Sequence, residues 1–343
     1  MRHDTTTTVD PADHPHGVTP WEDAGWRDAA LDWARERLAE HGLRERGPAA
    51  EVRLRPWSVL VRLPVDGDGH RTVWFKANPP SSRYEAGLGQ ALGAWVPEHV
   101  LVPLAVEAER GWSLLPDGGG LFRDELDRGL ADARAWEEPL RQYAALQRAL
   151  VGRTGDLLAL GVPDGRPAAL PAVFDRLVEE CGALDPAARA ALRARRPRLV
   201  AWCEELAATG VPDSLDHSDL HESQVLVRGQ DRYTFFDWGD AAVAHPFSTL
   251  LVTGRLIARR FGTDPLPRLR DVYLEAWTGD GTPVAELRRT VALASRLGAI
   301  GRALSWARVF PVRDGAAGGG DTAEATARWL HELFAEPGLW DTE

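Results

Sequence analysis

Cysteine is scarce in this sequence. Cys181 and Cys203 are the only two among 343 residues. Two cysteines are too few for a disulfide framework, and their spacing does not match a zinc knuckle. We expect both thiols to be reduced and inert within helices. Disulfide-stapled folds and cysteine-based zinc folds are therefore excluded.

Long apolar runs are also absent. No stretch approaches the roughly 18 to 20 apolar residues that a membrane span needs. The first twenty residues are polar and carry prolines, without the apolar core of a secretory signal. We expect residues 1–20 to form a flexible tail, and we expect a cytoplasmic protein that has no membrane partner.

Positive charge is outweighed by negative charge, which gives a net charge of −11. A surface of this sign repels a phosphate backbone, so no nucleic-acid partner is expected. The balance is compatible with a cationic substrate, and it is equally common in ordinary soluble enzymes.

Lysine is almost missing. Lys76 is the only lysine although Lys and Arg together number 40, and nearby Asn78 is the only asparagine. An ammonium is a compact point charge, whereas a guanidinium is a broad planar fork. A site that places one cation between two phosphates would retain lysine. The alternative is that this lysine survived by chance on a strand surface.

The periodicity of the first third predicts one helix followed by a sheet. Apolar residues recur at helical spacing up to Gly42. Short alternating segments then predict a five-stranded antiparallel sheet over about residues 48–117, with a serine-capped helix over 81–95 inserted after the third strand. The predicted strands cover 51–55, 57–64, 71–77, 100–109 and 111–117.

The remainder is mostly helical, after a glycine-rich hinge at 116–120. We therefore predict an α+β fold with a tail (1–20), a helix and β-rich lobe (21–117) and a larger helical lobe (118–343). Two short strands interrupt the helices, at 224–227 and 233–236. The predicted helices cover 121–133, 136–152, 168–182, 186–209, 246–261, 282–310 and 321–335.

Four residues in this pattern can carry phosphate chemistry. Strand alternation places Lys76 on one face, and Glu85 in the next helix can fold back to pair with it. Asp219, in the polar loop "HSDLHESQ", can accept the proton of a hydroxyl that attacks phosphorus. Asp237, at the end of the second short strand, suits magnesium because hard cations take oxygen ligands.

These motifs, in this order, resemble the aminoglycoside phosphotransferase branch of the protein-kinase-like fold. "HSDLHESQVLV" is similar to that branch's HGDLHxxNxL loop, and "FFDWGDAAVAHPFSTL" is similar to its metal-binding aspartate and the following helix. The resemblance covers about residues 48–260. It implies a two-lobed enzyme that uses ATP and magnesium to phosphorylate a hydroxyl of a small molecule, such as an aminoglycoside-like antibiotic, a sugar or an amino alcohol.

The resemblance also implies roles for individual residues. Lys76 would bind the α and β phosphates of ATP, oriented by Glu85, and Asp219 would be the catalytic base. Magnesium would be held by Asp237 with the amide oxygen of Gln224. We expect residues 76, 219 and 237 to meet at one triphosphate.

The adenine and phosphate contacts are expected elsewhere in the first lobe. Ser58 and neighbouring amides would cover the phosphates, and the backbone of Leu115 to Asp117 would meet adenine. An apolar slot would surround the base, built from Val59, Val61, Val73 and Leu114 above and from Leu226 and Phe236 below.

The departures from the family pattern leave alternatives open. Gln224 stands where the family has asparagine, so the runner-up hypothesis is a nucleotide-binding pseudokinase that acts as a sensor or partner-binding module. A protein kinase is the third possibility, but no arginine precedes Asp219 and no APE-like segment follows Asp237. We expect structural roles for His217 and His221.

The acceptor and the oligomeric state stay open at this stage. The region after the metal motif is acid-rich and would favour amines, or else it is a solvated surface. Arg302 and Trp306, one turn apart in a predicted helix, would instead suit a sugar or an anionic acceptor. The acidic residues are Asp264, Asp271, Glu275, Asp280 and Glu286.

Overall fold

The computed structural model contains two compact units. The first holds the described residues up to Gly119 together with Arg308 and Val309, and the second holds the other described residues, which lie within Gly120–Ala307 and after residue 319. The predicted tail falls outside the described part except for Pro20. The structure describes residues 20–21, 23–47, 51–55, 57–67, 69–129, 131–229, 231–309 and 320–341.

A curled antiparallel sheet forms the first unit, as predicted. Its order is β1-β3-β4-β6-β5, with β2 also paired to β3. The sheet has six strands instead of five because β1 and β2 pair with different parts of β3. The strands are β1 (Arg44–Glu45), β2 (Glu51–Arg55), β3 (Ser58–Asp66), β4 (Thr72–Ala77), β5 (Ala105–Glu107) and β6 (Trp112–Pro116).

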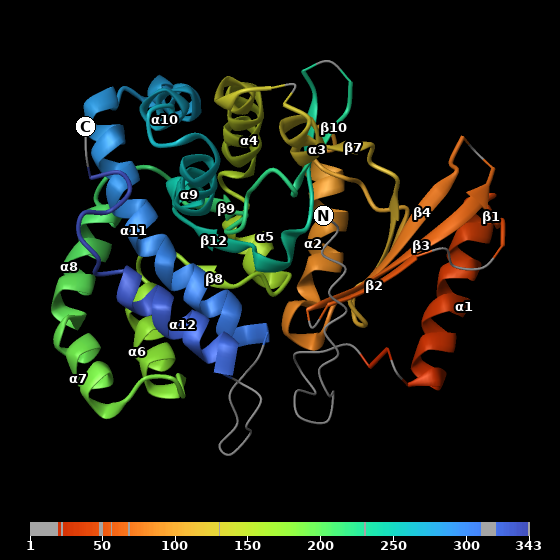
Figure 1. Ribbon diagram of the computed structural model, residues 1–343, viewed down its shortest axis with the longest axis horizontal. Helices are drawn as coiled ribbons and strands as arrows, with labels where there is room; N and C mark the ends of the chain where they lie inside the picture. Colours follow the sequence, from red (N-terminus) through yellow and green to blue (C-terminus); the bar gives the residue numbers. More distant parts are fainter. Residues whose placement is uncertain are drawn as a thin grey trace. The chain divides into compact units, whose positions relative to one another are not determined.

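The predicted first helix, α1 (Ala24–Glu40), covers one face of this sheet (Figure 1). It begins after Asp23, whose carboxylate accepts a hydrogen bond from the amide of Trp26 at 2.8 Å. Such an N-cap satisfies a backbone donor that has no partner within the helix. The core between helix and sheet includes Trp33, Leu38 and Phe75.

The prediction of the residues that form the upper wall of the adenine slot is wrong. Val59, Val61, Val73 and Leu114 all belong to the core packed with α1. Alternate residues of a strand point to opposite faces. These four side chains therefore lie on the face of the sheet opposite to that of Lys76.

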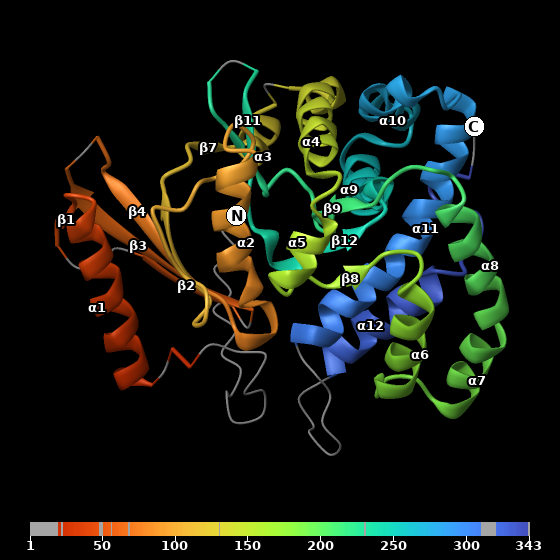
Figure 2. The same ribbon diagram turned by 180° about the vertical axis from the view of Figure 1, so that it is seen from behind.

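The helix that follows β4 lies on the side of the sheet opposite to α1 (Figure 2, which shows the molecule from behind). Pro79 and Pro80 end the strand, since proline has no N–H to offer the ladder. A turn of 3-10 helix, η1 (Pro80–Ser82), leads into α2 (Tyr84–Trp95). The predicted serine cap is absent: Arg83 holds the cap position without a side-chain hydrogen bond.

Helices make up most of the second unit, as predicted, but their boundaries differ. The single helix predicted over 186–209 is two helices, because Pro197 in the first turn of the second cannot continue the first. The short helices α5 and α10 were not predicted. The helices are α3 (Phe122–Asp127), α4 (Glu137–Leu150), α5 (Thr154–Ala159), α6 (Leu170–Glu180), α7 (Pro186–Ala194), α8 (Arg196–Ala207), α9 (Leu250–Phe261), α10 (Leu266–Leu274), α11 (Val284–Val309) and α12 (Gly320–Glu332).

Two small sheets position the loops of this unit. The predicted hairpin is β10 (Val225–Val227) and β11 (Tyr233–Phe235), extended by β7 (Gly120–Leu121). The other sheet was not predicted, since its strands have only two or three residues each: β8 (Asp164–Gly165), β9 (Ser214–Asp216) and β12 (Ala242–Ala244). Short 3-10 turns complete the unit: η2 (Ala133–Trp136), η3 (Trp238–Asp240), η4 (Pro246–Thr249) and η5 (Glu275–Asp280).

Among the described residues, none of the helices is both long and apolar enough to span a membrane.

Candidate active site

The solitary lysine sits in a buried ion pair within the first unit. Lys76 is the last residue but one of β4 and lies between Leu60 of β3 and Ser113 of β6. Its Nζ lies 2.6 Å from Oε1 of Glu85 in the first turn of α2. Lys76 is 7% exposed and Glu85 is 9% exposed. The pairing predicted between strand and helix is therefore present in the structure.

Asn78 completes this cluster, and sequence reasoning did not assign it a role. Its Nδ2 donates to Oε2 of Glu85 at 2.6 Å, so that both carboxylate oxygens are engaged. A carboxylate held at both ends has a fixed orientation. Two signals pointed to Asn78: it is the only asparagine, and it shares a strand face with Lys76.

The other residues predicted to contact nucleotide also lie in the first unit. Ser58 begins β3 and is buried. Leu115 lies in β6 opposite Trp74, and Asp117 follows that strand, where its Oδ1 accepts a hydrogen bond from the amide of Gly119 at 3.4 Å. Their roles in binding stay predictions.

The polar loop of the second unit is anchored on both sides of Asp219. The amide of His217 donates to the hydroxyl of Tyr143 at 2.8 Å, and Nε2 of His217 lies 2.9 Å from the carbonyl oxygen of Phe236. The hydroxyl of Thr253 donates to the carbonyl of Leu220 at 2.8 Å. These bonds join the loop to α4, to the residue before Asp237 and to α9.

His217 is buried, and burial lowers its pKa. A neutral imidazole that donates through Nε2 to a carbonyl serves as a fixed tether, in agreement with the structural role expected for it. His221 also caps the loop, because its Nδ1 accepts from the amide of Ser223 at 3.1 Å.

Ser218 takes a left-handed backbone conformation with φ at 61°. This region is sterically costly for a residue with a Cβ. The conformation is stabilised by the Ser218 hydroxyl, which donates to Oδ2 of Asp216 at 2.9 Å. The turn at Ser218 separates the buried Asp216 from Asp219, whose side chain is 23% exposed.

Asp219 is held among positive and polar groups. Oδ1 lies 3.2 Å from a terminal nitrogen of Arg302, and Oδ2 lies 3.6 Å from Nε2 of His221. Burial raises the pKa of Asp219, but the charge of Arg302 and the contact with His221 lower it by more, so the pKa lies below its ordinary value of 3.8. The carboxylate is therefore ionised at neutral pH and can accept a proton.

Gln224 and Asp237 lie at the same end of the β10–β11 hairpin. Val225 pairs with Phe235, and the amide of Phe236 donates to the carbonyl of Gln224 at 3.3 Å. Asp237 follows in a left-handed conformation, with φ at 66°. Aspartate tolerates this region better than most residues.

This hairpin end offers the donors that magnesium prefers. A carboxylate and an amide oxygen are hard ligands, and magnesium completes its shell with substrate phosphates and waters. No cluster of three or more His, Cys, Asp or Glu that could hold a metal alone occurs in the described part of the chain. One carboxylate and one amide oxygen leave positions in the shell of magnesium for phosphate oxygens and waters, so this donor set fits a metal that is bound together with a nucleotide.

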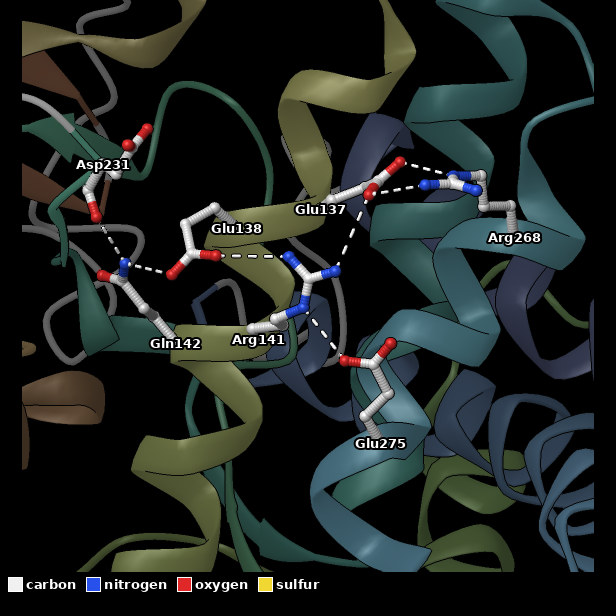
Figure 3. Close-up of polar contacts among 7 residues, drawn as sticks. All are labelled: Glu137, Glu138, Arg141, Gln142, Asp231, Arg268 and Glu275. Carbon is white, nitrogen blue, oxygen red and sulfur yellow. Dashed lines mark hydrogen bonds and ion pairs between the residues drawn. The ribbon is translucent and has the colours of Figure 1, made fainter.

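Two residues of the acid-rich region are already paired with arginines. Glu275 accepts a hydrogen bond from Nε of Arg141 at 3.0 Å, within the network of Figure 3. Asp271 pairs with Arg288 at 2.6 Å. Both carboxylates are therefore already engaged by arginines. The other contacts in Figure 3 are those of Arg141 with Glu137 and Glu138, of Gln142 with Glu138 and with the carbonyl of Asp231, and of Arg268 with Glu137.

Solved structures of small-molecule kinases share this fold. An ethanolamine kinase from Plasmodium vivax has a TM-score of 0.63 at 12% identity, covering 92% of this chain and 90% of the other. Choline kinase LicA from Streptococcus pneumoniae has a TM-score of 0.53 at 14% identity, covering 89% and 99%. The GDP complex of wild-type aminoglycoside 2'-phosphotransferase-IIIa has a TM-score of 0.53 at 16% identity, covering 89% and 98%.

At such identities these likenesses show the protein-kinase-like fold alone. A search of curated proteins finds no match to the sequence. The model of the phosphotransferase enzyme family, however, matches residues 36–289, which is most of the chain and includes both the lysine cluster and the Asp219 loop. The chain belongs to the phosphotransferase enzyme family.

Proposed function

We propose that this kinase transfers the γ-phosphoryl group of ATP to a hydroxyl of a small molecule, with Asp219 as the base. Lys76 binds the nucleotide phosphates, oriented by Glu85 and Asn78. Asp237 and Gln224 hold magnesium. The observation that carries the proposal most is the buried pair of Lys76 and Glu85, because the one lysine of the chain is fixed by a carboxylate at 2.6 Å.

The Asp219 carboxylate has the properties that this reaction asks of it. Phosphoryl transfer passes through a loose transition state, so the base needs correct placement more than high basicity. A pKa below the ordinary value keeps the carboxylate ready to accept a proton. Its side chain stays 23% exposed, whereas the neighbouring His217 is fully buried.

Magnesium would supply charge neutralisation to the phosphates when it is bound. The chain would contribute the side-chain oxygen of Gln224 and the carboxylate of Asp237. A backbone hydrogen bond from the amide of Phe236 to the carbonyl of Gln224 holds the two segments together at one end of β10–β11. The extra methylene of glutamine relative to asparagine lengthens the reach of the amide oxygen without changing its chemistry.

The acceptor class follows from the hydroxyl chemistry, not from surface charge. Asp271 and Glu275 are paired with arginines, so the acid-rich region by itself does not select the acceptor. Arg302, one of two residues considered for contact with a sugar or an anionic acceptor, is buried beside Asp219. We propose a small hydroxylated acceptor: an aminoglycoside-like antibiotic, a sugar or an amino alcohol.

The pseudokinase alternative is disfavoured. A protein released from catalysis need retain neither the ionised Asp219 nor the Asp237 carboxylate. Both are present, and the loop that carries Asp219 is fastened by hydrogen bonds from three directions.

A product assay tests the proposal directly. The protein is incubated with magnesium and either ATP or GTP, and with acceptors that include choline, ethanolamine, sugars, an aminoglycoside and a macrolide. Phosphorylated product is detected by mass spectrometry. Thermal shift with each acceptor selects the panel, since a ligand bound only by the native state raises the melting temperature.

Asp219→Asn is the matched control for this assay. It should abolish transfer while nucleotide affinity stays nearly the same, because asparagine cannot take the proton but preserves the side-chain shape. Normal turnover in Asp219→Asn would refute the base assignment. Nucleotide binding by the wild type without any phosphorylated product would favour the pseudokinase.

A further inference from the structure

A buried arginine of α11 joins the loop of Asp219 to the metal motif. Arg302 is 8% exposed. We propose that Arg302 is a positioning residue for the reaction, whose guanidinium fixes Asp219, Asp240 and the Ser218 peptide in one arrangement. This inference rests on the proposed role of Asp219 as the base.

The contacts of Arg302 come from separate segments of the second unit. One terminal nitrogen lies 3.2 Å from Oδ1 of Asp219 in the loop after β9. The other lies 3.4 Å from Oδ2 of Asp240 in η3 and donates to the carbonyl of Ser218 at 3.2 Å. One planar group thus ties α11 to the loop of the base and to the turn that follows Asp237.

The arrangement assigns different tasks to the two oxygens of Asp219. Oδ1 is directed to the guanidinium, which leaves Oδ2 as the oxygen that accepts the proton of the acceptor hydroxyl. His221 lies 3.6 Å from Oδ2 and limits its rotation on the other side. A carboxylate restrained in this way meets the acceptor in one orientation, and small misplacements of a catalytic group are costly to the rate.

The same contact fixes the backbone before the base. Ser218 adopts its left-handed conformation immediately before Asp219, and its carbonyl accepts from Arg302. A hydrogen bond to that carbonyl favours the observed peptide orientation. Arg302 therefore acts on both the side chain and the backbone that place Asp219.

The charges around this cluster make the arginine hard to replace. Asp219 is faced by Arg302, His221 and His217, and Arg302 is faced by Asp219, Asp240 and Asp216. Burial acts to lower the pKa of Arg302, while Asp219 and Asp240 raise it above its ordinary value. A guanidinium presents donors in several fixed directions, whereas an ammonium is a single point.

A purely structural role for Arg302 predicts different results, and Arg296 provides the comparison. Arg296 lies on the same helix, and the two arginine side chains are equally buried, at 10% exposure each. Its partners are the carbonyl of Ala335, the carboxylate of Asp341 and the ring of Trp202, and among the described residues none of these belongs to the loop of the base. Arg296→Met should therefore lower stability while retaining turnover.

The experiment compares Arg302→Met, Arg302→Lys and Arg296→Met in the full chain, with the acceptor found by the product assay. Arg302→Met should lower kcat by about 10²-fold, with KM for nucleotide changed less than about twofold, since misplacement of a reacting group acts on the chemical step. Added methylguanidine should restore part of the kcat of Arg302→Met but not that of Arg296→Met.

Arg302→Lys keeps the inference falsifiable if the methionine variant does not fold. Lysine retains the charge but not the fork, so kcat should fall by about tenfold or more while the melting temperature stays close to that of the wild type. Wild-type kcat in Arg302→Lys, or equal kcat in Arg302→Met and Arg296→Met, would overturn the positioning role and leave the kinase proposal intact. An absence of product from the wild type would instead defeat both.

Discussion

Replacement of the buried carboxyl of Asp216 by an amide, in Asp216→Asn, should stabilise the protein above neutral pH. Asp216 ends β9 and is 3% exposed. Burial raises its pKa from 3.8 to about 6, although hydrogen bonds from Ser218 act in the opposite direction. The folded protein therefore carries an acid that ionises only at the cost of desolvation.

The magnitude follows from the two pKa values. In the unfolded chain the group ionises near 3.8, and in the folded protein near 6. Between these values the folded state binds more protons than the unfolded state, so the free energy of unfolding falls as pH rises through this window. Above pH 6 the accumulated loss is about 3 kcal/mol. Asparagine carries no charge and avoids this loss.

Urea denaturation from pH 4 to pH 8 measures the effect. The free energy of unfolding of Asp216→Asn minus that of the wild type should increase from pH 4 to pH 6 and then stay constant. Asp156→Asn, an exposed carboxylate paired with Arg153 at 3.1 Å, is the control and should show no such rise. A difference for Asp216→Asn that does not depend on pH would refute the assigned ionisation.

Two further substitutions test the proposed nucleotide and metal contacts. Lys76→Arg should strongly reduce activity although it keeps the charge, because the planar guanidinium cannot reproduce the point contact of the ammonium with Glu85. Steady-state kinetics together with a melting curve check this. Unchanged kinetics would mean that the single lysine was retained by chance. Gln224→Asn should preserve or improve activity and its dependence on magnesium, measured by titration of the metal; a variant that no longer responds to magnesium would contradict the ligand role.

Local patterns in the sequence determined much of the first unit. The antiparallel sheet, the helix before it and the pairing of Lys76 with Glu85 were all predicted. Strand alternation and helix spacing act over a few residues, and Glu85 is only nine residues from Lys76. The sequence could not show that α1 covers the face of the sheet that carries Val59, Val61, Val73 and Leu114, so the predicted upper wall of the adenine slot was wrong.

In the second unit the sequence predicted the loop of Asp219 and the hairpin before Asp237, because their motifs are contiguous. It did not predict the sheet of β8, β9 and β12, whose strands are too short to show a period. From the sequence, Arg302 was considered only as a residue that could contact the acceptor. Its place beside the base depends on contacts with Ser218, 84 residues away, and such contacts are decided by how α11 packs in three dimensions.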